Sequence, residues 1–268
     1  MIKKLLFSLG LIAFVGFQSH AEKIVLEGST TVLPIAQKAA EVFMAKNPSA
    51  DISVRGGGSG VGIASLLDKA CDIADASRAI KETEIAKASS NGVDPKAYVI
   101  AMDGIAVIVN PANSVSALSK KQIKDIFTGK ISNWSQVGGS DEKIVVVSRD
   151  TSSGTFEAFG ELVLNKEKVR RDALMQASNQ AVASVIEKTS GAIGYVGLGY
   201  VSSSVKALTV DGVMPSKETV LTSKYSVGRP LFMYTNGMAK GLAKEFIDFI
   251  LSSEGQKIVD GEGFVALK

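Results

Sequence analysis

The feature that most constrains this chain is a unit that recurs along it. Each unit has an apolar strand pattern, a turn rich in glycine and hydroxyl residues, and then a helix pattern, and units occur around residues 24–47, 51–67 and 144–164. Alternating strands and helices are typical of α/β folds with largely parallel sheets. Such sheets bind ligands at the carboxyl ends of their strands, where these turns fall. We therefore expect an α/β protein whose turns converge on one site.

Two of these turns carry groups suited to a small oxyanion. The first contains Ser29, Thr30 and Thr31, and the last is the run Arg149-Asp150-Thr151-Ser152-Ser153-Gly154-Thr155. The free N–H groups and the dipole of a helix start favour an anion, and hydroxyl and guanidinium donors add to that preference. An N-capped helix beside a surface arginine is the alternative interpretation.

A glycine-rich turn, residues 55–62, follows the second strand pattern. Its glycines allow backbone N–H groups to converge where a Cβ would obstruct them. The turn lacks the Gly-Lys-Ser or Gly-Lys-Thr ending of a phosphate-binding loop of nucleotide hydrolases, so nucleotide binding is not expected. A further short strand and turn, residues 72–78, ends in Ser77 and Arg78. A flexible linker at the glycines and a solvated Arg78 are the alternatives.

The rest of the chain continues the alternation. Strands are expected at residues 98–102, 104–109, 190–196, 207–210 and 229–234. Helices are expected at residues 118–127, 166–175, 180–187 and 242–251. The chain is long enough for two lobes.

The amino terminus has the pattern of an export signal. A charged Met-Ile-Lys-Lys start precedes an apolar run over residues 5–17, and Ser19-His20-Ala21 forms a small-x-small cleavage site. We expect residues 1–21 to be a signal peptide removed after Ala21, because the apolar run is too short to span a bilayer comfortably. The mature protein should then be soluble and periplasmic.

Charge and composition exclude several classes of function. Cleavage removes two of the 30 basic residues and the only histidine, against 27 acidic residues. A nearly neutral chain with scattered charges is not expected to bind nucleic acid. Without histidine, Ser-His-Asp catalysis, Cys-His catalysis and imidazole zinc sites are excluded. Cys71 is the single cysteine, and we expect it to be a small buried hydrophobe.

Five segments occur in an order that resembles the periplasmic phosphate-binding proteins of high-affinity phosphate ABC transporters. They are residues 28–34, 57–60, 75–78, 126–134 and 149–156. The resemblance runs from about Lys23 to near the carboxyl terminus, and its last two segments are the most specific. It implies a two-lobed type II periplasmic binding protein, each lobe a mostly parallel sheet flanked by helices. It also implies inorganic phosphate and an inner-membrane ABC permease as partners, a monomer, no cofactor, no metal and no enzymatic activity.

The resemblance also implies lobes and ligands. The first lobe would comprise residues 22–108 and 230–268, and the second residues 109–229, with crossing strands at the boundaries. It implies phosphate ligands in both lobes, and the turn after the third strand adds Ser77 and Arg78 as candidates. The full set is Ser29, Thr30, Thr31, Ser59, Ser77, Arg78, Arg149, Ser153, Gly154 and Thr155.

One position departs from the family pattern. Some members place a carboxylate directly after the serine that follows the third strand, whereas here Arg78 follows Ser77. Asp75 is the nearest carboxylate and is the candidate proton acceptor for phosphate, with Asp150 as an alternative. A carboxylate that only accepts hydrogen bonds would repel sulfate, which has no proton to donate. A carrier for sulfate or another tetrahedral oxyanion therefore stays open, and a secreted phosphatase-like enzyme is the alternative from a different class.

Overall fold

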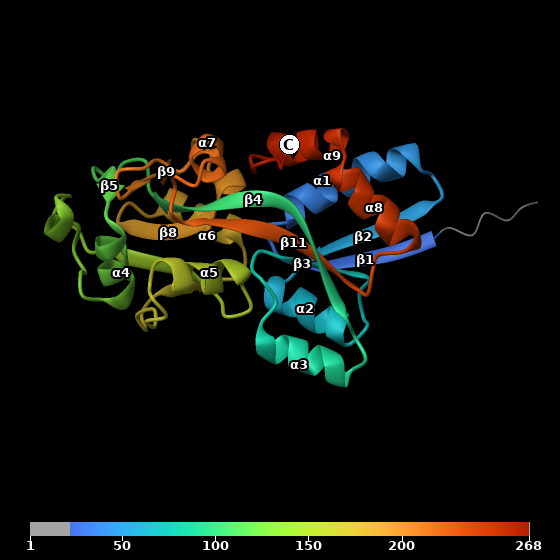
Figure 1. Cartoon of the computed structure of the whole chain (residues 1–268). Helices are drawn as coiled ribbons and strands as arrows, with labels where there is room; N and C mark the ends of the chain where they lie inside the picture. Colours follow the sequence, from blue (N-terminus) through green and yellow to red (C-terminus); the bar gives the residue numbers. More distant parts are fainter. Residues whose placement is uncertain (1–21, 268) are drawn as a thin grey trace, which may run out of the picture.

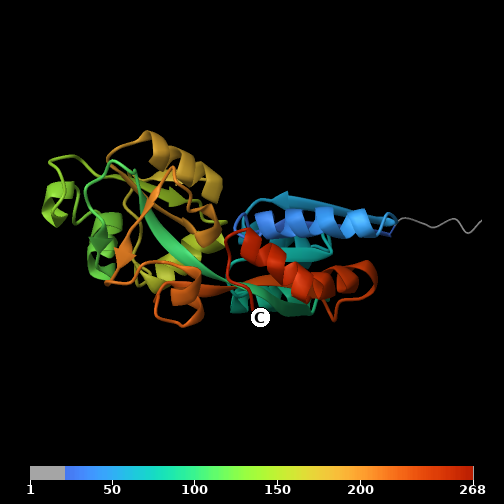
Figure 2. The same ribbon diagram turned by 90° about the horizontal axis from the view of Figure 1, so that it is seen from above.

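The computed structural model describes residues 22–267, so the expected signal peptide lies outside the described residues. This part of the chain has an α/β fold in which nine strands join into one mixed sheet, in the order β2-β1-β3-β11-β4-β8-β6-β7 with β9 beside β4. Figures 1 and 2 show two bodies side by side, which we call the first and second lobes. The expected α/β class is confirmed.

The first lobe is built on three parallel strands: β1 (Glu22–Gly28), β2 (Ala50–Gly56) and β3 (Ile73–Ala76). One face packs against α1 (Leu33–Lys46), α8 (Gly241–Leu251) and α9 (Ser253–Gly261), and the other against α2 (Ser59–Leu67) and α3 (Glu82–Ser90). Side chains alternate across a strand, so Ile24 and Leu26 point to the α1 side and Val25 to the α2 side. Each face thereby has its own apolar core.

The second lobe has β6 (Val145–Arg149) parallel to both β7 (Leu174–Gln176) and β8 (Ala192–Gly197). Helices α4 (Lys120–Thr128) and α5 (Gly154–Leu162) pack on one side, and α6 (Asn179–Lys188) packs on the other. The short elements of this lobe are β5 (Ala117–Leu118), β9 (Lys206–Ala207), β10 (Thr209–Val210), α7 (Lys217–Leu221) and the 3-10 turns Trp134–Val137 and Leu198–Tyr200.

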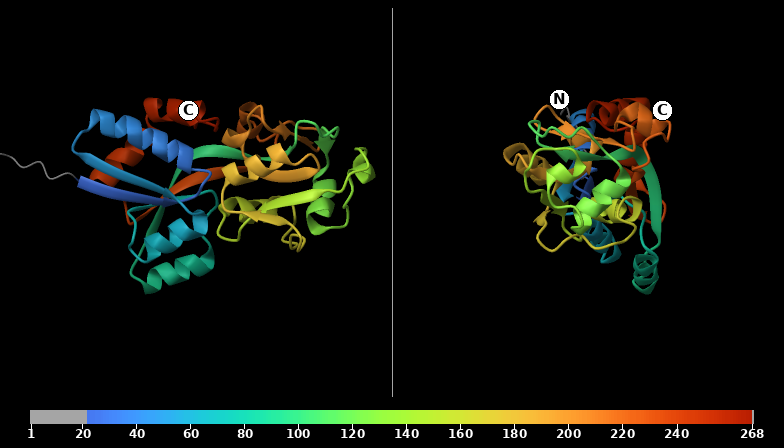
Figure 3. Two further views of the ribbon diagram at one scale, coloured as in Figure 1. Left: turned by 180° about the vertical axis from the view of Figure 1, so that it is seen from behind. Right: turned by 90° about the vertical axis from the view of Figure 1, so that its left-hand side faces the viewer.

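Two long strands, β4 (Pro95–Val109) and β11 (Gly228–Asn236), connect the lobes (Figure 3). They pair antiparallel from Gly228 opposite Gly104 to Asn236 opposite Pro95. On β4, Ile100 lies in the core of the first lobe and Ile105 in that of the second. The two strands therefore form the covalent connection between the lobes.

Some expectations were wrong in detail. Residues 98–102 and 104–109 form one strand, β4, with Asp103 inside it. The helix expected at residues 166–175 is absent from the described chain, because Asn165 and Lys166 adopt positive φ angles of 52° and 64° that end the helical path. Residues 174–176 instead form β7, parallel to β6. Helices α3 and α9 were not expected.

Cys71 is 8% exposed, and its Sγ lies 3.8 Å from the carbonyl oxygen of Gly62. Burial raises the pKa of this thiol to about 12. The cysteine is therefore a buried apolar residue, as expected. Within residues 22–267, no helix is long and apolar enough to cross a membrane.

Candidate anion-binding site

The turns before α1, α2 and α5 meet where the two lobes touch. Ser59, the first residue of α2, accepts a hydrogen bond from Ser77 N at 3.0 Å through its hydroxyl. The hydroxyl oxygen of Thr31, before α1, lies 3.0 Å from that of Thr155 in α5. Helix N-termini carry unpaired N–H groups and a partial positive charge, so three of them close together favour an anion.

Gly154 permits the closest approach between the lobes. A Cβ at this first residue of α5 would lie 2.3 Å from Ser59 Oγ and 2.7 Å from Ser77 Oγ. Real Cβ atoms do not approach other atoms this closely, so a side chain here would force the lobes apart. The missing side chain brings the start of α5 next to the hydroxyl groups of the first lobe.

The ten ligands named from the sequence are all buried: Ser29, Thr30, Thr31, Ser59, Ser77, Arg78, Arg149, Ser153, Gly154 and Thr155. Two of their hydroxyls support the local backbone. Ser29 Oγ accepts from Thr31 N at 3.1 Å, and Ser153 Oγ accepts from Phe156 N at 3.2 Å as the N-cap of α5. A hydroxyl that accepts a backbone N–H still has its own proton to donate, so both serines keep a donor for an anion.

Arg149 ends β6 and is 1% exposed. Its Nε donates to Gln176 O at 3.1 Å, and its Nη2 donates to Ala177 O at 3.0 Å and to Thr30 Oγ1 at 3.2 Å. Nη1 is buried and has no hydrogen-bond partner within residues 22–267. Burial lowers the pKa of the guanidinium, but an arginine side chain still carries its charge at neutral pH. A buried cation with unused donors is suited to an anion.

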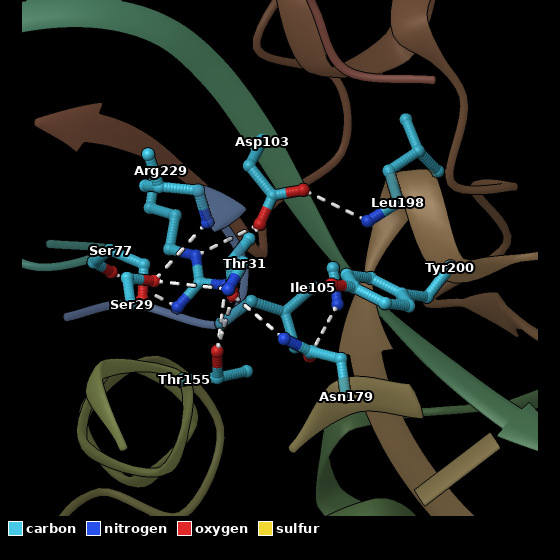
Figure 4. Close-up of polar contacts among 12 residues, drawn as sticks. Ser29, Thr31, Ser77, Asp103, Ile105, Thr155, Asn179, Leu198, Tyr200 and Arg229 are labelled. Carbon is cyan, nitrogen blue, oxygen red and sulfur yellow. Dashed lines mark hydrogen bonds and ion pairs between the residues drawn. The ribbon is translucent and has the colours of Figure 1, made fainter. Parts of the chain in front are cut away.

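A second arginine, which was not singled out in the sequence, lies among Thr31, Ser77 and Thr155 (Figure 4). Arg229 of β11 is directly opposite Asp103 of β4 and contacts Asp103 Oδ2 through Nε at 3.0 Å and Nη2 at 2.8 Å. Its Nη2 also donates to Thr155 Oγ1 at 3.0 Å, and its Nη1 donates to Ser77 O at 3.0 Å. Burial raises the pKa of Asp103 and lowers that of Arg229, and the attraction between the two opposes both shifts. Arg229 thereby links both lobes at the site.

Asn179 and Tyr200 of the second lobe hold the first-lobe turn, and they were also missed. The Asn179 amide donates to Thr30 Oγ1 at 3.2 Å and to Thr31 Oγ1 at 3.0 Å. The Tyr200 hydroxyl donates to Thr30 O at 2.5 Å. An asparagine at a helix start is commonly a cap, so its sequence position gave no separate signal.

Arg78 is not brought into the cluster. Its guanidinium contacts Glu84 Oε1 through Nη2 at 2.7 Å and Glu157 Oε2 through Nε at 2.7 Å. Glu84 belongs to α3 in the first lobe, whereas Glu157 belongs to α5 in the second. Both residues lie in a bend that follows β3, and the Arg78 guanidinium lies with these two carboxylates.

Asp75 is 1% exposed on β3, and its carbonyl oxygen accepts from Ser29 N at 2.8 Å. Neither carboxylate oxygen has a hydrogen-bond partner in the described part of the chain. Burial raises the pKa of this carboxyl well above its usual range, so the neutral acid is favoured. Asp150 differs, because its Oδ1 already accepts from Ser152 N at 3.0 Å and from Ser152 Oγ at 2.6 Å.

The described residues contain no group of three or more His, Cys, Asp or Glu side chains placed to hold a metal ion. What the arrangement offers is a set of hydroxyl, backbone N–H and guanidinium donors from both lobes. Such donors bind an oxyanion through charge-assisted hydrogen bonds.

Comparison with known proteins identifies the family. Residues 17–254 match the PBP superfamily domain. Over 255 residues the chain is 38% identical to the phosphate-binding protein PstS of Bacillus subtilis (strain 168). This alignment covers 93% of this chain and 82% of that protein. The chain belongs to the PstS family.

Two further proteins agree with this assignment. PstS of Borreliella burgdorferi is 36% identical over 263 residues, covering 92% of this chain and 91% of that protein. The structure of a putative phosphate ABC transporter substrate-binding protein with bound phosphate from Clostridium perfringens is similar, with a TM-score of 0.86 and 38% identity over 92% of this chain and 100% of that one. The family and the two-lobed type II binding-protein fold inferred from the sequence are confirmed.

Proposed function

We propose that this protein captures inorganic phosphate between its two lobes and delivers it to an inner-membrane ABC permease. The observation that carries the proposal is the buried meeting point of three helix N-termini with Arg149, whose Nη1 has no partner within residues 22–267. Relatives that are named phosphate-binding proteins, at 34–38% identity, support phosphate as the oxyanion. The proposal is of a carrier without catalytic activity, exported to the periplasm and working as a monomer.

The proposed phosphate ligands come from both lobes. They are Ser29, Thr30, Thr31, Ser59 and Ser77 of the first lobe, and Arg149, Ser153, Gly154 and Thr155 of the second. Arg78 keeps at most a backbone N–H for the ligand, because its guanidinium contacts Glu84 and Glu157. Arg229 and Asn179 position hydroxyl groups, and Tyr200 holds the backbone carbonyl of Thr30.

Closure of the lobes follows from this division of ligands. We keep residues 22–108 with 230–268 as the first lobe and residues 109–229 as the second, with bending in β4 and β11. A ligand shifts a conformational equilibrium only by its extra affinity for one state. Phosphate held by Thr31 on one side and Thr155 on the other favours the closed state, since an open cleft offers only half of the donors.

Asp75 stays the candidate proton acceptor for phosphate. Its two carboxylate oxygens have no partner in residues 22–267, whereas oxygens of Asp103 and Asp150 already accept hydrogen bonds. To accept a proton from phosphate, Asp75 must be ionised, which burial disfavours. Asp75→Asn should therefore narrow the difference in affinity between phosphate and sulfate, because an amide can donate to sulfate.

The test is calorimetric titration of the mature, ligand-stripped protein with phosphate and, separately, with sulfate. We expect micromolar or tighter phosphate binding, which corresponds to about 8 kcal/mol or more, and no heat with sulfate. Sulfate binding as tight as phosphate binding, or no binding of either anion, contradicts the proposal. A chromogenic phosphate ester incubated with metal-supplemented protein checks for turnover, and we expect none.

A further inference from the structure

A groove of about 600 Å³ lies beside α5, and its lining begins at Phe156, the residue after Thr155. Its wall is formed by α5, by the loop of residues 163–173 and by β7, and α5 lies on the lower side of the molecule in Figure 1. The apolar lining comes from Phe156, Leu164, Val169, Ala173 and Met175, of which Met175 is 47% exposed. We call this surface the basic groove, for the charges described next.

Half of the charged side chains that line the basic groove form ion pairs, and the unpaired half consists mainly of cations. Glu167 contacts Lys124 Nζ at 2.6 Å, and Arg170 contacts Asp172 at 2.6 Å. The lining residues without an ion pair in the described chain are Lys166, Lys168, Arg171 and one carboxylate, Glu161. Arg170 also has a buried Nη1 without a hydrogen-bond partner in residues 22–267. The groove therefore combines an apolar floor with a net positive rim.

The first lobe contributes one side of the basic groove. Lys81, the residue before α3, lines it and contacts Glu157 Oε1 of α5 at 2.8 Å. Arg78 contacts the other oxygen of Glu157 at 2.7 Å. Since these contacts cross from one lobe to the other, the complete groove exists only when the lobes are in contact. A partner that binds it can distinguish the closed form from an open one.

We propose that the basic groove is a docking surface for an acidic, apolar-bearing periplasmic loop of the permease. This inference rests on the proposed function, because it specifies where the carrier meets its transporter. Unpaired lysine and arginine side chains attract an acidic segment and set its register, whereas the apolar floor buries its hydrophobic side chains. The contribution of Lys81 restricts docking to the closed, loaded carrier.

The experiment uses the transporter of the same organism, reconstituted in nanodiscs with its ATPase subunit. Phosphate-stimulated ATP hydrolysis is measured as a function of carrier concentration for three proteins. They are the wild type, the groove pair Lys168→Glu/Arg171→Glu and the control pair Lys224→Glu/Lys257→Glu. Both control lysines are exposed; Lys224 follows α7, and Lys257 lies in α9. These two helices are on the upper side of the molecule in Figure 1, opposite α5. Each protein is also titrated with phosphate by calorimetry.

We expect the groove pair to need at least about tenfold more carrier for half-maximal hydrolysis, while the control pair stays within about twofold of wild type. Phosphate affinity should stay within about twofold in all three proteins, because neither pair contacts the anion site. Equal stimulation by the groove pair and wild type overturns the docking surface, and so does an equal loss in the control pair. A wild-type protein without phosphate affinity refutes the proposed function instead, so the two failures are distinguishable.

Discussion

Replacing Arg149 with glutamine should weaken phosphate binding by one to two orders of magnitude. Arg149 has three contacts from Nε and Nη2 to Gln176, Ala177 and Thr30, which leaves the two N–H groups of Nη1 without a partner in the described residues. A hydrogen bond to a charged group contributes about 1.5–3 kcal/mol, and each 1.4 kcal/mol changes affinity by about tenfold. Loss of one such bond therefore predicts an affinity about 10- to 150-fold lower.

The measurement is the phosphate dissociation constant from calorimetry at fixed pH and salt. Arg171→Gln serves as the matched control, because Arg171 is an exposed arginine of the same lobe and should leave affinity unchanged. Circular dichroism melting establishes that both variants fold. An Arg149→Gln affinity within about twofold of wild type would refute the assignment of Arg149 as an anchor for the anion.

Three further predictions concern other contacts at the site. Gly154→Ala should weaken phosphate binding and increase the radius of gyration of the phosphate-loaded protein in small-angle scattering. Gly160→Ala in the same helix should change neither, because a Cβ at Gly160 meets nothing within 4 Å. A phosphate-loaded Gly154→Ala protein as compact as wild type would contradict this prediction. Because folding raises the pKa of Asp75, the ligand-free wild type loses stability as the pH rises from the usual carboxyl range towards the raised pKa. Asp75→Asn should therefore raise the melting temperature more at pH 8 than at pH 4. A change in melting temperature that is the same at both pH values would count against this prediction. Arg229→Met leaves the buried Asp103 carboxylate unpaired and should cost roughly 3–5 kcal/mol in urea unfolding. Adding Asp103→Asn should recover part of that loss, and no recovery would show that the pair is not the cause.

The strand-turn-helix units were predictable because their signals are local. Hydroxyl and glycine residues between an apolar strand and a helix pattern have few conformations that satisfy the backbone, and the starts of α1, α2 and α5 follow from them. Helices α3 and α9 escaped prediction because they contain few apolar side chains. Ala88 is the only buried residue of α3, and the buried residues of α9 are Gly255, Gln256 and Val259.

The Arg229–Asp103 pair depends on long-range register. The two residues are opposite each other only because β4 and β11 pair antiparallel across more than 120 positions of sequence. The sequence showed only Asp103 between two expected strands and Arg229 at the start of another. They indicate partners only once the strands are known to be neighbours.

Arg78 is the opposite case, because its sequence position beside Ser77 suggested a ligand whose side chain lies elsewhere. It follows Ser77, but its guanidinium lies with Glu84 and Glu157. Its position depends on ion pairs with α3 and α5, and a resemblance based on segment order does not place those helices. Whether the Arg78 backbone contributes to binding stays a prediction.

The buried state of Cys71 simplifies chemical labelling of the protein. Maleimides react with the thiolate, and a thiol with a pKa of about 12 that is 8% exposed supplies almost none at neutral pH. A cysteine introduced at the exposed Thr151, beside the boundary between the lobes, would then be the reactive thiol of the mature chain. The native background is thus already suited to a single fluorophore that reports lobe closure in solution, without first replacing Cys71.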